Sequence, residues 1–487
     1  MSRPTHNSQR SEFSDAAPSG NSQVVRRLAA PIAFIGLIVA QLLRNTSVLD
    51  RVWAEDGAVF GRQAFENHLW QQVGRGYAGY LVAPERLLAA PIVSVVPPSS
   101  WGRWFAFSAM AVAAFSALAV YRLSGGILRA RSTRAALALL VAVGPKMRGE
   151  WPAIANVGWP LLVAMFWVII SVRSDRLSTV VRCLIAGLAI TAIGLALAFV
   201  PLALVVLGAR DVPVLKRFFD RPSMVHGPEQ QRLKRADRHL GFVILVSAAL
   251  QIIGLATAVA GPKPFRSTPI DIARLLMVRV FGSVLVGERF VDEAWKNWGM
   301  AFAVVSVAVI GTGLVFGVRR ASVSTRSLVF AAIVHAVAIG VASLRTRGTE
   351  PFALQPGRFS FDAERYFILP AFLVASAIAI AIDRRSEHAV RVTESVVATE
   401  SARKDVASGQ SLSPSPGPSA MFAVFVLVVL VATGFTQRNA EEPSEPWSVA
   451  LRDARAACRN DRGLLQVDIP IAPAGIFRLT VPCARLR

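Results

Sequence analysis

The sequence predicts an all-α polytopic membrane protein with roughly eleven transmembrane helices. Of its 487 residues, 53% are hydrophobic and only 17% are charged, whereas soluble proteins carry about 25% charged residues. The apolar residues gather in uncharged runs, such as 241–261 and 422–435, that approach or reach the ~20 residues needed to cross a bilayer. The short alternating segments of a membrane β-barrel are not visible. The lipid bilayer is therefore the expected environment of the chain.

Eleven segments qualify as membrane spans, and a large outer loop separates the first from the second. They cover residues 28–46, 101–123, 134–146, 158–172, 181–194, 195–208, 240–260, 299–318, 326–344, 366–382 and 421–436. The stretch 183–207 has two interpretations: one span bent at Pro201, or two half-spans that meet on the far side of the membrane.

The net charge of +22 comes from basic residues that are spread over many short connections between the spans. They form neither a basic domain nor a basic arm, so nucleic acid is not an expected partner. With a cytoplasmic N-terminus, the arginines of 129–134, 173–182 and 319–326 lie inside, as the positive-inside rule requires. We therefore expect a multi-pass protein of the plasma membrane whose C-terminus lies outside the cytoplasm.

These assignments divide the chain into five regions. Residues 1–27 are a polar cytoplasmic N-terminus that we expect to be disordered, and residues 28–382 form the multi-spanning transmembrane core, which we expect to carry any active site. Residues 383–420 are rich in Ser, Pro and charge, which predicts a disordered cytoplasmic linker. Residues 421–436 form the final span, and residues 437–487 form a small extracytoplasmic cap.

The cap contains two of the three cysteines, Cys458 and Cys483, while Cys183 lies in a span. Cys458 and Cys483 are therefore the only candidates for a disulfide, which an oxidising compartment permits. Two unpaired thiols are the alternative.

An acidic pair, Glu55 and Asp56, directly follows the exit of the first span. Ionisable groups at membrane depth are costly and are by default functional candidates. The alternative is that the two carboxylates are a solvated loop pair, or that they cap an amphipathic helix over residues 58–70.

Four segments carry a resemblance to a known family. They are WAEDGAVF (53–60), YAGYLVAPERLLAA (77–90), NVGWPLL (156–162) and ERYFILP (364–370). Across residues 28–382 they resemble the bacterial multi-spanning glycosyltransferases of the C-type (GT-C) superfamily, which use polyprenyl-phosphate-linked sugars.

The resemblance implies that a carboxylate in the first outer loop is catalytic, which points to Asp56 or Glu55. It also implies a polyprenyl-phosphate sugar as donor and an envelope glycan or lipid as acceptor. Some members use a divalent metal, but two carboxylates alone do not establish one, so the cofactor is unknown.

Transfer of the sugar requires a general base for the acceptor proton and cations near the leaving phosphate. Arg365 with Tyr366, at the mouth of a later span, is the leading phosphate contact, because a guanidinium can bind phosphate bidentately. An interfacial anchor is the alternative for this pair. Further arginines in the same loop are Arg345, Arg347 and Arg358.

The loop 146–159 falls on the same side of the membrane. Asn156 and Trp159 are candidates to bind the sugar, and Lys146 or Arg148 to meet phosphate. Trp159 can equally be an ordinary interfacial aromatic. His335, inside an apolar run, is either a proton relay or a buried neutral histidine.

The predicted function is an integral membrane glycosyltransferase that acts on the extracytoplasmic face. A multi-spanning transporter or lipid flippase is the alternative. Transporters often contain an internal repeat, and none is evident, whereas long outer loops favour a surface active site. The chain has no GxxxxGK[ST], HExxH or GxSxG motif, so nucleotide hydrolysis, common zinc sites and the usual serine hydrolase elbow have no support.

The predicted orientation can be tested by labelling single cysteines in a chain without native cysteines. We expect an impermeant maleimide on intact cells to label a cysteine at Ala58 and not one at Ser322. Labelling at Ser322 alone would invert the topology and place the acidic pair inside.

Overall fold

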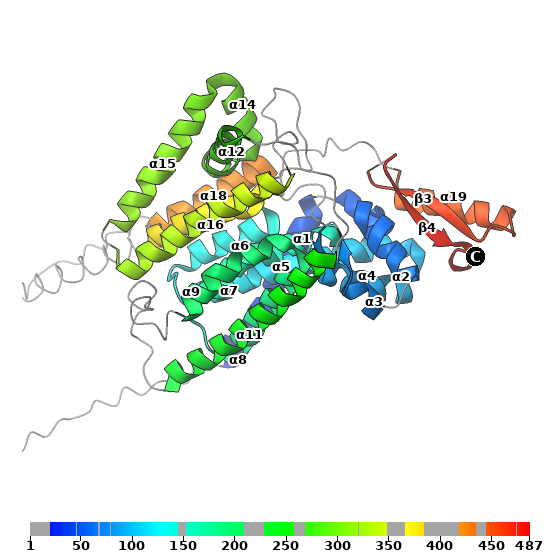
Figure 1. Ribbon diagram of the computed structural model, residues 1–487, viewed down its shortest axis with the longest axis horizontal. Coiled ribbons are helices and arrows are strands. Elements are labelled where there is room, and N and C mark those ends of the chain that lie inside the picture. Colours follow the sequence, from blue (N-terminus) through cyan, green and yellow to red (C-terminus); the bar gives the residue numbers. More distant parts are fainter. Residues whose placement is uncertain are drawn as a thin grey trace, which may run out of the picture.

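A computed structural model describes residues 20–44, 46–66, 69–77, 79–144, 152–208, 228–257, 268–319, 321–347, 366–383, 418–434, 445–473 and 475–487. The chain forms a bundle of helices with a smaller module at one end (Figure 1). The first outer loop and the last residues of the chain make this module together. Two small two-stranded sheets depart from the predicted all-α fold.

The protein is a helical multi-pass membrane protein. Within the described residues, five helices are long and apolar enough to cross a membrane: Pro98–Ser124, Gln230–Thr257, Met300–Val318, Val323–Arg345 and Tyr366–Asp383. Three shorter apolar helices are Leu28–Arg44, Ile154–Ile170 and Gly194–Gly208. A helix overlaps each predicted span, but the number of crossings stays a prediction.

Among the described residues, the bundle contains ten labelled helices and the helix Tyr366–Asp383. The labelled helices are α1 (Gly20–Arg44), α5 (Trp101–Ser124), α6 (Arg131–Val143), α7 (Gly158–Ile170), α8 (Arg176–Ala192), α9 (Val200–Gly208), α11 (Pro228–Thr257), α15 (Met300–Val318), α16 (Val323–Arg347) and α18 (Pro418–Gly434). The stretch 183–207 forms two helical pieces. The break falls at Ile193, which has extended backbone angles, so a single span bent at Pro201 is wrong.

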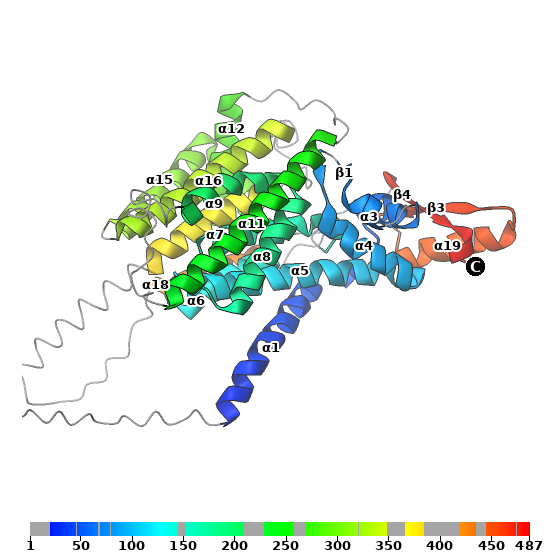
Figure 2. The same ribbon diagram turned by 60° about the horizontal axis from the view of Figure 1, so that its bottom comes forward.

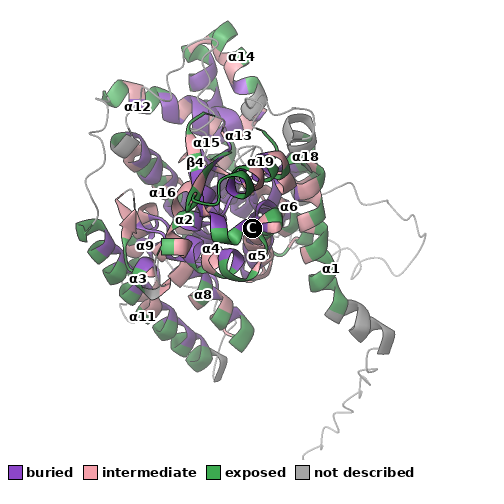
Figure 3. Ribbon diagram, turned by 90° about the vertical axis from the view of Figure 1, so that its right-hand side faces the viewer, coloured by how far each residue is buried: buried purple, intermediate pink, exposed green. Residues whose placement is uncertain are grey.

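The outer helices present apolar side chains where a soluble protein would present polar ones. On α1 and α11 the exposed large residues include Ile32, Ile35, Leu43, Phe242 and Ile253. Figure 3 shows these two helices at the edge of the bundle, and Figure 2 shows α1 leaning away from it. Large exposed apolar surfaces mark membrane contact, so these faces fit a lipid environment.

The centre of the bundle is α7, in which every residue is buried. Its neighbour α5 buries mainly small side chains toward the core, including Ala106, Ala109, Ala113 and Ala117. Small residues let helix backbones approach closely, which compensates for the weak driving force between apolar helices in lipid. The position of α7 matters because its N-terminal end lies at the module that carries the acidic residues.

Several predicted boundaries differ from the structure. Helix α1 begins at Gly20, so residues 20–27 are helical where disorder was expected. At the linker, Asp383 still belongs to the preceding helix, and its carboxylate accepts hydrogen bonds from the backbone N–H groups of Arg129 (2.8 Å) and Ala130 (2.9 Å). Residues 1–19 and 384–417 lie outside the described residues.

The first outer loop is built of short elements instead of one amphipathic helix. They are η1 (Thr46–Asp50), η2 (Asp56–Gly61), α2 (Arg62–Glu66), α3 (Leu69–Val73), β1 (Gly76–Tyr77), β2 (Tyr80–Leu81), α4 (Ala83–Val95) and η3 (Pro98–Ser100). A second irregular region follows α11 and contains α12 (Pro269–Leu276), η6 (Met277–Gly282), α13 (Ser283–Val286) and α14 (Glu288–Trp298).

The C-terminal cap consists of α19 (Trp447–Asn460), β3 (Gln466–Ile471), β4 (Phe477–Pro482) and η9 (Cys483–Arg485). The two strands pair antiparallel, and a disulfide with an S–S distance of 2.03 Å joins Cys458 to Cys483. The buried residues of the cap, such as Trp447 and Leu479, form one core with those of the first outer loop, such as Phe60. The cap and the loop are therefore one folded module.

An ion pair is buried between α8 and α11. Arg182 and Asp237 are 2.8 Å apart, and their side chains are 1% and 5% exposed. By contrast, Arg62 and Glu66 form an exposed pair at 3.7 Å in the outer loop, with side chains 51% and 56% exposed. The buried charges have no water to replace a lost partner.

We predict that Asp237→Ala lowers the free energy of unfolding by about 3–5 kcal/mol, because it leaves the Arg182 charge buried without its carboxylate. Glu66→Ala should cost no more than about 1 kcal/mol. Unfolding of the two purified variants in SDS/detergent mixtures measures both. Equal losses would show that burial does not govern the Arg182–Asp237 pair.

Candidate active site

The cap holds the segment that precedes the acidic pair. The backbone N–H of Ala54 donates to the carbonyl of Ala472 (2.6 Å), and the N–H of Ala472 donates to the carbonyl of Val52 (3.1 Å). The cap also packs on Gly57, where an added Cβ would come 2.7 Å from Cδ1 of Ile471. The backbone on either side of Glu55 and Asp56 is therefore fixed by the C-terminal residues.

Asp56 lies at the start of η2, and only 1% of its surface is exposed. Its carboxylate oxygens accept hydrogen bonds from the backbone N–H groups of Ile154 (2.9 Å) and Ala155 (2.8 Å). These groups belong to η4 (Ile154–Asn156), the turn that leads into α7. For Asp56 both structural alternatives are wrong, because the side chain is not solvated and does not cap the following helix.

The environment of Asp56 changes its acidity. Burial raises the pKa of Asp56 from 3.8 to about 7, although the hydrogen bonds from Ala155 and Ile154 lower it; the nearby Glu55 charge raises it further. A general base is most effective when its pKa lies near the working pH. Asp56 therefore has the acidity that base catalysis at neutral pH requires.

A second buried carboxylate, Glu85, lies in the first turn of α4 and is 2% exposed. Its Oε1 is 3.5 Å from the position that a Cβ on Gly158 would take, at the start of α7. Burial raises the pKa of Glu85 well above its ordinary value; the charge of Arg86 lowers it and that of Asp56 raises it. The sequence reasoning missed Glu85, although it stands in the quoted segment 77–90.

Arg86 follows Glu85 in the sequence, but its guanidinium is directed to other groups and does not pair with the Glu85 carboxylate. Arg86 is also buried, but its guanidinium donates to Oε1 of Gln63 (3.0 Å) and to the carbonyl of Arg75. Oε2 of Glu85 is buried and has no hydrogen-bond partner among the described residues. An acidic residue followed by a basic one in an apolar segment was the signal available in the sequence.

Gln251 of α11 lies near the same end of the bundle and is fully buried. Its Oε1 accepts from the N–H of Leu81 (3.0 Å), while its Nε2 has no partner within the described chain. An added Cβ on Gly194 would lie 3.8 Å from that Nε2, and one on Gly158 would lie 3.5 Å from Cβ of Ile193. The side chains of Glu85 and Gln251, each with one unpartnered polar atom, therefore flank the junction 193–194 between α8 and η5 (Gly194–Phe199).

The structure brings together several residues that were predicted to form the site. Asn156 is 4% exposed and belongs to the turn that Asp56 binds. Trp159, 5% exposed, contacts the ring of Tyr366 edge-on with centroids 5.4 Å apart. The segments NVGWPLL and ERYFILP are thus neighbours in space. Glu55 is half-buried beside Asp56.

Of the arginines and the lysine predicted to contact phosphate, the structure describes the side chain of Arg345 alone. Arg345 is exposed near the end of α16 and forms no ion pair with the described residues. Lys146, Arg148, Arg358 and Arg365 lie outside the described residues, as does the side chain of Arg347. Across the described ranges, no group of three His, Cys, Asp or Glu residues is arranged to hold a metal ion.

The acidity of Asp56 predicts how stability depends on pH. Because its pKa in the fold (about 7) exceeds the ordinary 3.8, the folded state binds the proton more tightly, and stability is lost as the pH rises through this window. The loss amounts to at most about 4 kcal/mol.

Asp56→Asn removes the titrating group, so its melting temperature should fall less than that of the native chain between about pH 5 and pH 8. Glu55→Gln, a matched neighbour, should keep most of the native slope, because the Glu55 charge is the smallest of the causes that act on the pKa of Asp56. Identical slopes for the native chain and Asp56→Asn would contradict the raised pKa.

The comparisons with known proteins add no relative. No protein-family model matches the chain, and no curated protein matches it at a significant level. The functional argument therefore depends on the residues of the site: Asp56 and Glu85 at the N-terminal end of the central helix.

Proposed function

We propose that the chain is an integral membrane glycosyltransferase that moves a sugar from a polyprenyl-phosphate donor to an acceptor of the cell envelope. The single observation that carries the proposal is the buried Asp56 carboxyl, with a pKa of about 7, at the end of an apolar helical bundle. A lipid-linked donor reaches such a site from the bilayer, and a hydroxyl acceptor needs a base there.

In the proposed reaction Asp56 accepts the proton of the acceptor hydroxyl. The acceptor oxygen then bonds to the anomeric carbon, and the bond from that carbon to the phosphate oxygen breaks. The polyprenyl phosphate leaves with the bonding electrons, and Arg365 with Tyr366 would stabilise its charge. The contact between Tyr366 and Trp159 supports this assignment, since it brings the ERYFILP helix to the start of α7.

Glu85 and Gln251 are proposed to bind hydroxyl groups of the sugar. Oε2 of Glu85 and Nε2 of Gln251 are buried without partners in the described part of the chain, which is costly unless a ligand satisfies them. A carboxyl group and an amide N–H together match a hydroxyl, which both donates and accepts. Gly158 and Gly194 pack closely beside these groups, since a Cβ added there would lie 3.5 Å from Oε1 of Glu85 and 3.8 Å from Nε2 of Gln251.

The finer topology belongs to the same proposal. We propose eleven crossings of the plasma membrane, a GT-C-like fold, a cytoplasmic N-terminus and an extracytoplasmic Asp56. The hydrogen bonds of Asp383 to the 129–130 connection support it, because the predicted inner ends of two distant helices meet there. The disulfide in the cap supports it too, since disulfides persist outside the cytoplasm.

Transfer of radiolabelled sugars from a panel of polyprenyl phosphates, measured with purified protein, tests the function. Asp56→Asn should lower the rate by about 10²–10⁴, the worth of a general base. Glu55→Gln should be milder, and Glu85→Gln should mainly raise KM for the donor.

The pH profile separates a base from a structural cap. Asn at position 56 also leaves one of the N–H groups of Ile154 and Ala155 unsatisfied, so a lower rate alone is ambiguous. The native rate should rise with pH up to about 7, where Asp56 loses its proton. Full transfer by both Asp56→Asn and Glu85→Gln would rule out this site, whereas a native chain that transfers no sugar from any donor of the panel would make a transporter or flippase the better proposal.

A further inference from the structure

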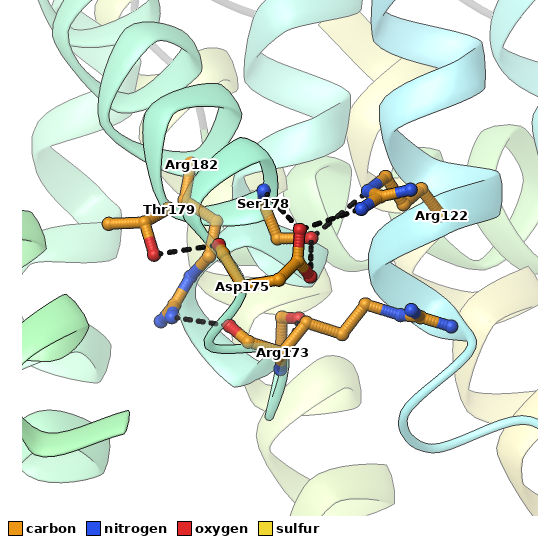
Figure 4. Close-up of polar contacts among 7 residues, drawn as sticks. Arg122, Arg173, Asp175, Ser178, Thr179 and Arg182 are labelled. Carbon is orange, nitrogen blue, oxygen red and sulfur yellow. Dashed lines mark hydrogen bonds and ion pairs between the residues drawn. The ribbon is translucent and has the colours of Figure 1, made fainter. Parts of the chain in front are cut away.

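Three arginines meet at the end of the bundle opposite to Asp56. Arg122 lies in the last turn of α5, Arg134 in the first turns of α6, and Arg173 in the turn between α7 and α8. We call them the arginine cluster. Figure 4 shows Asp175, the acidic residue among them, with Arg122 to the right of its carboxylate and Arg173 below it.

Asp175 forms an ion pair with Arg122 but not with Arg134 or Arg173. Its carboxylate forms an ion pair with Arg122 (2.7 Å) and accepts from the N–H (3.0 Å) and the hydroxyl (2.7 Å) of Ser178. Partial burial raises the pKa of Asp175, but the bonds from Ser178 and Arg122 outweigh it and hold the pKa at about 2. Asp175 is therefore fully charged and fully engaged.

Arg134 and Arg173 converge without an acidic partner. Nη1 of Arg134 and Nη2 of Arg173 both lie against the position that a Cβ on Gly125 would take, the latter at 2.8 Å. In the ranges that the structure describes, no carboxylate pairs with either guanidinium, and the Nε of each is buried without a hydrogen bond. Arg134 only packs over the ring of Tyr121, at 5.0 Å.

Two like charges that converge in a half-buried place repel each other. Burial, and after it the charge of Arg122, lowers the pKa of Arg173; Asp175 opposes this and Arg134 adds to it. The positive-inside rule explains why arginines occur in the connections between helices. It does not explain why the guanidinium groups of Arg134 and Arg173 lie together beside Gly125, each with a buried Nε that has no hydrogen bond. An anion between them would explain both features.

We propose that Arg134 and Arg173 bind a phosphate group at this end of the bundle, supplied by an anionic phospholipid or by a soluble phosphate compound. Guanidinium groups suit phosphate because each presents a planar fork of donors to its oxygens. The side chain of Arg122 is 38% exposed, so the arginine cluster is open to the surface. The site is independent of the proposed transfer reaction.

The test uses the full chain, stripped of lipid in detergent, and measures melting temperature and native mass spectra. One arm adds phosphatidylglycerol, with phosphatidylcholine as the neutral comparison, and the other adds inorganic phosphate. We expect phosphatidylglycerol, phosphate or both to bind and stabilise the native chain. Binding of phosphatidylglycerol alone identifies a lipid, and stabilisation by phosphate identifies a soluble source.

The double variant Arg134→Gln/Arg173→Gln should weaken this binding about tenfold or more, the effect of losing charged hydrogen bonds. The matched control Arg131→Gln/Arg176→Gln removes two exposed arginines from the same end and should bind as the native chain does. Arg134→Lys/Arg173→Lys preserves the charge, so it should fold even if the glutamine variant does not, and it should still bind more weakly.

Three results would overturn the proposal. The first is a native chain that neither anion stabilises. The second is an equal loss in the control variant, which would mean nonspecific attraction. The third is binding that appears only after residues 388–414 are deleted, which would mean that carboxylates of the chain itself occupy the arginines.

Discussion

The architecture of the site depends on the two hydrogen bonds that the Asp56 carboxylate accepts from Ile154 and Ala155. They join the first outer loop to the turn that opens α7, the helix with no exposed residue. The first turn of a helix has unpaired N–H groups and a partial positive charge, so it attracts a carboxylate. The loop, the cap that packs on it and the central helix are fixed relative to one another through this contact.

The same contact sets two forces against each other. Burial favours the protonated carboxyl, whereas the N–H groups favour the charged one, and burial exceeds them enough to bring the pKa to about 7. Glu85 lacks a comparable set of donors from the turn and has an unpartnered oxygen. Two carboxyl groups at one helix end thus have different surroundings, which is how acid and base roles are separated in enzymes.

Much of the helical architecture could be predicted from the sequence, because the length of an apolar segment is a local property, and that length decides whether a helix can cross the bilayer. The pairing of Asp56 with Ile154 could not, since the two are 98 residues apart and meet only in the folded protein, where α4 contacts both η2 and η4. The burial of Glu85 could not be predicted either, because the sequence does not show that the adjacent Arg86 turns to Gln63. The break at Ile193 agrees with the predicted boundary between the spans 181–194 and 195–208, whereas Pro201, the stronger sequence signal for a bend, lies inside the second helical piece.

The cap has a consequence for the order in which the protein is made. Ser448 binds the carboxylate of Asp50 across 398 residues of sequence, and Ala472 bonds to the backbone on either side of Trp53. Chains are synthesised from the N-terminus and tend to fold in that order. The first outer loop can therefore reach its final structure only after the last helix has been inserted and the cap has folded onto the loop. A product truncated before the cap would retain its helices but lack an assembled acidic site.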